Sequence, residues 1–134
     1  RLAAEFLSWS LSFFRRARAE CVDQMLNARA RGWNTLALVG GSDLAEIAIL
    51  CANEQGIRIV GIVDAGIARP DVHGVPVFAV LESVTPRPDG WMVTGIQDAQ
   101  SRHDAAVAHA GLVFVLTPPM LSVQRVALKQ DSQP

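Results

Sequence analysis

A glycine turn followed by a helix cap is the part of this sequence whose residue types carry the clearest chemistry. Gly40, Gly41 and Ser42 follow a short apolar run and precede a segment with helical periodicity. The glycines let the backbone turn sharply, and Ser42 or Asp43 can cap the helix that follows. The N–H groups and the dipole at such a helix N-terminus stabilise a bound phosphate. The stretch therefore predicts a site for a phosphate-bearing ligand.

An acidic residue follows the turn at a spacing that suits contact with a ribose. Asp64 ends a second apolar run about 20 residues further on, the spacing at which a carboxylate can meet a ribose hydroxyl. The turn itself reads Gly40-x-Ser42-x-x-Ala45, a relaxed form of the dinucleotide fingerprint. Ala45 satisfies the demand for close helix packing, whereas Ser42 places a side chain where a pyrophosphate would approach. We expect a nucleotide-like ligand here; the alternative is a fold that keeps the turn without the ligand.

Two later strands are expected to end beside the same turn. In open α/β sheets the ligand crevice lies outside the carboxyl ends of the strands. Thr94 and Gly95 lie at the end of the fourth predicted strand, and Thr117 lies at the end of the fifth; turn capping is the alternative role for these residues. The complete set of candidate binding residues is Gly40, Gly41, Ser42, Asp43, Asp64, Thr94, Gly95, Ile96 and Thr117.

Catalysis by a nucleophile or a metal is not favoured by the residue pattern. Gly40-Gly-Ser42 lacks the second glycine of a nucleophile elbow, because Leu44 stands in its place. His73 falls in a predicted loop, and His103 and His109 fall on a predicted polar helix face, so no base pairs with Ser42. The three His and two Cys have no metal-ligand spacing. The expectation is binding without conversion, with no catalytic residue and no metal.

Alternating strands and helices must position these residues. Apolar runs predict an α/β fold with an open, Rossmann-like parallel sheet of order 3-2-1-4-5, preceded by a long helix. A helical turn is expected at 79–84, and a last strand or short helix at 122–128. Because Pro76 removes a ladder donor, the third strand is expected at a sheet edge. The predicted strands span residues 35–39, 57–63, 75–78, 91–94 and 112–116, and the main helices of the sheet region span about 43–55 and 97–110.

The first thirty residues form the second organising feature. Residues 2–30 contain no Gly or Pro and carry two neighbouring apolar stripes, more than one sheet face can cover. The surplus, with Trp9, Phe13 and Phe14, predicts a homodimer through residues 1–31. A membrane span is not favoured, since the apolar run is shorter than about 20 residues and contains serines. We divide the chain into a dimerisation or linker helix (1–31), a ligand-binding domain (33–128) and a frayed tail (129–134).

Composition agrees with one well-buried domain. The 134 residues are 50% hydrophobic and 19% charged, with a net charge of −1, so no global field points to nucleic acid or an anionic membrane. Cys21 and Cys51 lie among apolar neighbours and are interpreted as core residues, which favours a cytoplasmic setting. No signal peptide is recognisable. The chain begins with Arg, and we expect it to be part of a longer protein.

Two segments resemble a known family. Val60-Gly-Ile-Val-Asp64 followed by His73-Gly-Val-Pro-Val77 is similar to a segment of the Rossmann-like domains that precede nucleotide-sugar dehydratases and sugar acyltransferases, and of related ligand-sensing regulators. The resemblance covers about residues 35–96. It implies a nucleotide or nucleotide-sugar ligand over residues 40–42, Asp64 and residues 94–96. NAD(H), a nucleotide sugar and coenzyme A are the candidate ligands.

The arginine-bearing helix predicted over residues 1–31 favours one of three possible functions. A long helix joined to a Rossmann-like domain resembles the dimer helix of winged-helix transcription regulators, among them the redox-sensing repressors that read NADH. The analogy implies a ligand-sensing regulatory domain, with DNA contacted only through a module outside this chain. The competing hypothesis is an accessory domain of a nucleotide-sugar dehydratase or acyltransferase. The third hypothesis is a degenerate fold that has no ligand and is kept only for dimerisation.

Overall fold

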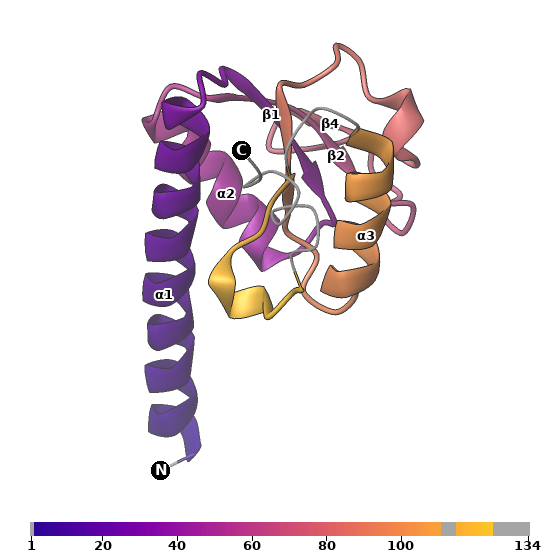
Figure 1. Cartoon of the computed structure of the whole chain (residues 1–134). Helices are drawn as coiled ribbons and strands as arrows, with labels where there is room; N and C mark the ends of the chain where they lie inside the picture. Colours follow the sequence, from indigo (N-terminus) through magenta and orange to yellow (C-terminus); the bar gives the residue numbers. More distant parts are fainter. Residues whose placement is uncertain (1, 111–114, 125–134) are drawn as a thin grey trace.

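The computed structural model of the chain describes residues 2–110 and 115–124 (Figure 1). Helices and strands alternate after a long first helix, which confirms the predicted α/β class. The helices are α1 (Leu2–Ala30), α2 (Asp43–Glu54) and α3 (Ala99–Ala110), with short 3-10 turns η1 (Leu81–Ser83) and η2 (Pro119–Leu121). The strands are β1 (Thr35–Val39), β2 (Arg58–Val63), β3 (Asp71–Val72), β4 (Val75–Phe78), β5 (Gly90–Val93) and β6 (Val115–Leu116).

The described strands form one six-stranded sheet in the order β3-β4-β2-β1-β5-β6. All neighbouring pairs are parallel except β3 and β4, which are antiparallel. The order differs from the predicted 3-2-1-4-5 because β3, a strand of two residues in a turn-rich loop, adds to the edge. The 3-10 turn η1 confirms the helical turn expected at 79–84. Residues 112–114 and 125–128, parts of two predicted elements, lie outside the described residues.

The prediction that Pro76 marks an edge strand was wrong. Pro76 pairs with Asp71 of β3, so β4 has a neighbour on both sides. The missing donor is tolerated because the registered pairs with β2 begin one residue later, at Val77. On the other side, the N–H of Val77 donates to the carbonyl of Pro70 at 2.9 Å. A proline can therefore lie in an inner strand at a position that precedes the registered pairs with one of its two neighbours.

Helices cover both faces of the sheet, so the molecule has three layers. In Figure 1, α1 and α2 lie on one side of the strands and α3 on the other. Alternate residues of β1 follow this division, since Leu36 and Leu38 belong to the core under α1 and α2, whereas Ala37 and Val39 belong to the core under α3. A strand covered on both faces must be apolar at every position. This explains the continuous apolar run that predicted β1.

The helix α1 packs through its C-terminal half and extends past the body through its N-terminal half (Figure 1). Ala17, Cys21, Met25 and Ala28 are fully buried at three- and four-residue spacing, as one helical stripe requires. The core role predicted for both cysteines is confirmed, because Cys51 is equally buried on α2. The N–H of Trp33 donates to the carbonyl of Ala28 at 3.0 Å, which ends the helix around Gly32.

The helix α1 exposes two large apolar side chains, Leu11 at 57% and Phe14 at 53%. Within residues 2–110 and 115–124, no helix is both long enough and apolar enough to cross a membrane.

Candidate functional site

The candidate site lies where β1, β2 and β5 end together at one edge of the sheet. Because α2 crosses to one face after β1 and α3 to the other after β5, the two connections diverge between these neighbouring strands. Such a point of divergence is where open α/β sheets leave a crevice for a ligand. The two turns that border it meet closely. The N–H groups of Thr94 and Gly95 both donate to the carbonyl of Val39, at 2.9 and 3.0 Å.

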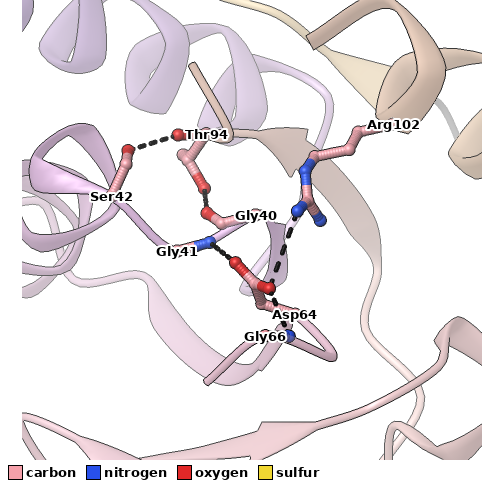
Figure 2. Close-up of polar contacts among 7 residues, drawn as sticks. All are labelled: Gly40, Gly41, Ser42, Asp64, Gly66, Thr94 and Arg102. Atoms are coloured by element: carbon pink, nitrogen blue, oxygen red, sulfur yellow. Dashed lines mark hydrogen bonds and ion pairs between the residues drawn. The ribbon is translucent and has the colours of Figure 1, made fainter. Parts of the chain in front are cut away.

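Two hydroxyl groups tie the first turn to the end of β5. Ser42 Oγ donates to the carbonyl of Thr94 at 2.6 Å and accepts from the N–H of Leu44 at 3.1 Å, so Ser42 is the N-cap of α2. Thr94 Oγ1 donates in return to the carbonyl of Gly40 (Figure 2). The Ser42 side chain is thus turned toward β5, and its hydroxyl both donates and accepts within the fold. This arrangement fixes the turn and leaves the hydroxyl no base to activate it.

Asp64 holds the other side of the turn, at the end of β2. Its Oδ2 accepts from the N–H of Gly41 at 2.8 Å, and its Oδ1 accepts from the N–H of Gly66 at 2.9 Å (Figure 2). The guanidinium of Arg102 lies 3.6 Å from Oδ1. Burial alone would raise the pKa of Asp64, but the two backbone hydrogen bonds and the guanidinium outweigh it, so the pKa lies below its ordinary value. The carboxylate is therefore charged at neutral pH.

Arg102 is the site residue that sequence reasoning missed. It comes from the first turns of α3, and its guanidinium points toward Asp64 (Figure 2). Its Cδ and Nε lie against Gly95. Its Nε is buried and has no hydrogen-bond partner within the described part of the chain. A buried donor without a partner is expensive, about 1–3 kcal/mol for a typical group. The only sequence signal was its position, seven residues after the second glycine turn.

A cavity of about 470 Å³ opens over these groups. Six of the nine predicted residues line it: Gly41, Ser42, Asp43, Asp64, Gly95 and Ile96. Gln97, Asp98 and Arg102 complete the lining. Gly40 and Thr94 lie behind this surface, where they hold the two turns together. The cavity offers carboxylates that accept hydroxyl groups, and one guanidinium with the N-terminus of α2 that can receive an anion.

Thr117 is placed elsewhere, away from the predicted crevice. Its side chain is 1% exposed, and its Oγ1 lies 3.0 Å from His103 Nδ1 on α3. Its carbonyl accepts from Gln24 Nε2 of α1 at 3.3 Å. His103 is itself 1% exposed, so its predicted position on a polar helix face was also wrong. These residues connect α3 to α1 instead of lining the cavity.

The groups at the cavity include carboxylates, a guanidinium and backbone N–H groups of the two turns. Ser42 Oγ donates to a backbone carbonyl, and no histidine lines the cavity. Among the described residues there is also no group of three His, Cys, Asp or Glu side chains that could hold a metal ion. In comparisons with known proteins, no family model, no curated protein and no solved structure matches the chain.

Proposed function

We propose that this chain is a ligand-sensing regulatory domain that binds a nucleotide-type ligand in the cavity between the β1 and β5 turns. The observation that carries the proposal is the meeting of Asp64, Gly41 and Arg102 at the point where the α2 and α3 connections diverge. Asp64 keeps acceptor capacity for a ribose hydroxyl, because a carboxylate has about four lone-pair sites. Arg102 and the N-terminus of α2 receive the phosphate.

The state of Arg102 supports binding over a purely structural role. Its closest charged partner is Asp64, at a nitrogen–oxygen distance of 3.6 Å, beyond a good hydrogen bond. Its buried Nε has no partner among the described residues. An arginine that has an unpartnered Nε and only a long ion pair gains more from a bound phosphate than one already held by short hydrogen bonds. The guanidinium is therefore available to a ligand without breaking a strong contact.

Buried polar contacts that link α3 to α1 support a role in sensing over a role in binding alone. Arg102 is followed on α3 by His103, which contacts Thr117, and Thr117 is bonded to Gln24 of α1. Glu20 of α1 adds a parallel contact, accepting from the N–H of Met120 at 2.7 Å. A ligand that repositions Arg102 acts on α3 next to His103, and so on the contacts that hold α1.

The helix α1 is the proposed output element. Leu11, Phe14 and Leu26 expose more than half of their side-chain surface on it, which supports a homodimer through residues 1–31. In this proposal a DNA-binding module outside the chain would read the dimer geometry that the ligand sets. The domain belongs to the Rossmann-like ligand-binding class that its sequence resembles, and it acts in the cytoplasm.

Ligand binding is tested by thermal unfolding of the chain with NAD(H), UDP-glucose and coenzyme A. A ligand at about 100 times its Kd stabilises the fold by roughly 2.7 kcal/mol, a Tm rise of about 8–12 °C for a domain of this size. Arg102→Met should abolish the rise. Arg87→Met is the matched control, because Arg87 is exposed and precedes β5 at the opposite end of the strands. No Tm rise with any of the three ligands would refute the nucleotide site.

The dimer is tested separately by sedimentation velocity. The double variant Leu11→Glu with Phe14→Glu should sediment as a monomer, because each change places a charge on the proposed interface. Leu50→Glu is the control, since Leu50 is 60% exposed on α2 and lies outside that interface. A wild-type chain that stays monomeric at high concentration would remove the dimer from the proposal.

A further inference from the structure

A second cavity, of about 430 Å³, adjoins the first and is not explained by a phosphate or a ribose. It lies between α3 and the segment that follows β4, over the carboxyl ends of β1 and β2. The two cavities share Asp98 and Arg102 in their linings. Arg102 therefore stands at the boundary between them. A single ligand of nucleotide length can occupy both spaces side by side.

The second cavity has a different chemistry from the first. Its floor is Val39 and Val63, and its sides are Val80, Leu81 and Ala105. Val80 is 49% exposed, although it is a large apolar side chain. Glu82 and Asp98 are the acidic residues of its lining, and both are exposed. This space is apolar with acceptors at its margin, so it disfavours a second anion and favours a flat apolar group that carries N–H donors.

We propose that this cavity is a nucleobase slot, and that the ligand is recognised by its base as well as by its phosphate and ribose. The inference rests on the proposed function, since it assigns the base of the ligand bound in the first cavity. Nucleobases are flat and have apolar faces, which match the walls of Val80, Leu81 and Ala105. The amine of adenine and the ring N–H of uracil are the donors that Glu82 or Asp98 would accept.

The slot is tested by calorimetric titration of the whole chain with ADP, UDP and inorganic pyrophosphate. ADP represents NAD(H) and coenzyme A, UDP represents nucleotide sugars, and pyrophosphate has no base. We expect at least one nucleotide to bind about tenfold or more tightly than pyrophosphate, because burial of a base adds apolar and polar contacts. The tighter of the two nucleotides identifies the base.

The variant Ala105→Trp fills the slot from an exposed position on α3. It should bring nucleotide affinity down to that of pyrophosphate while leaving pyrophosphate affinity within twofold of wild type, which also shows that the variant is folded. Ala108→Trp, an exposed alanine one turn further along α3, is the matched control and should bind as wild type. Equal wild-type affinity for all three probes, or an equal loss of all three in Ala105→Trp, overturns the slot but not the phosphate site. Failure of all three to bind overturns both.

Discussion

The substitution Gly40→Ala should be among the most damaging single changes in this chain, although it adds one methyl group. Gly40 has a φ of +102°, and a Cβ built on it would lie 2.4 Å from the Cα of Gly95 and 2.5 Å from its nitrogen. A side chain at such a φ costs about 1–3 kcal/mol. Because the clashing atoms are backbone and cannot rotate away, forced repacking adds about 1–3 kcal/mol. We expect a total loss of about 4 kcal/mol.

The control for this prediction is Gly74→Ala. Gly74 also has a positive φ, of +80°, but a Cβ there would meet no atom within 4 Å. It therefore measures backbone strain alone, about 1–2 kcal/mol. The difference between the two variants isolates the contact between the β1 and β5 turns.

Urea unfolding followed by far-ultraviolet circular dichroism measures both variants. With a slope of about 1.5 kcal/mol per molar urea, Gly40→Ala should lower the midpoint by about 2.5 M and Gly74→Ala by about 1 M. If the two variants lie within about 1 kcal/mol of each other, the close approach of Gly40 and Gly95 does not hold the site together. The cavity would then not depend on contact between the β1 and β5 turns.

Three further predictions concern neighbouring groups. Gly95→Ala should cost less stability than Gly40→Ala yet weaken ligand binding, because its Cβ would lie 2.4 Å from Arg102 Cδ, a side-chain atom that can move away from Asp64; wild-type affinity in this variant would contradict the role of Arg102. Since the pKa of Asp64 is lowered on folding, its stabilisation is complete above about pH 4 and is lost as the pH falls through the lowered value. Asp64→Asn should therefore flatten the acid decline of the urea midpoint below about pH 4, and an unchanged decline would refute this assignment. Burial, with smaller contributions from Cys51 and Glu20, raises the pKa of Cys21 to about 12, and burial also raises the pKa of Cys51. Neither cysteine should therefore react with an aromatic disulfide reagent at pH 8 until urea unfolds the chain; rapid reaction of the native protein would show that the α1–α2 packing opens.

The parts of the fold that the sequence predicted correctly depend on local pattern. The turn at residues 40–42 and the cap at Ser42 follow from which residues sit next to an apolar run, and the helix α1 from 29 residues without Gly or Pro. Asp64 could be placed because the end of β2 must lie beside the end of β1 in a parallel pair. Each of these inferences depends on the residues of one element, or of two elements that are neighbours in the sheet.

The parts that were missed depend on how distant elements meet. The strand β3 has two residues and exists because it pairs with β4, which no local periodicity can indicate. Arg102 became a site residue through the rotation of α3 about its axis, which brings it over Gly95. His103 had a signal that was overlooked. It falls four residues after Ala99 and three before Ala106, on the buried stripe of α3, but small alanines make that stripe weak as a hydrophobic pattern.

The position of Gln24 supports the proposed coupling between the cavity and α1. The sequence placed residues 1–31 and 33–128 in different domains, yet Cys21 and Met25 of α1 belong to the same core cluster as Leu36 of β1. Gln24 lies on the buried stripe of α1 and is 5% exposed, and its Nε2 donates to the carbonyl of Thr117. A buried polar bond costs more to break than an exposed one, because its groups have no water to replace their partner. A shift of α3 that carries His103 therefore has to move Thr117, whose carbonyl is bonded to Gln24, or break the contact between His103 and Thr117. In the proposed mechanism, this requirement carries the binding event to α1.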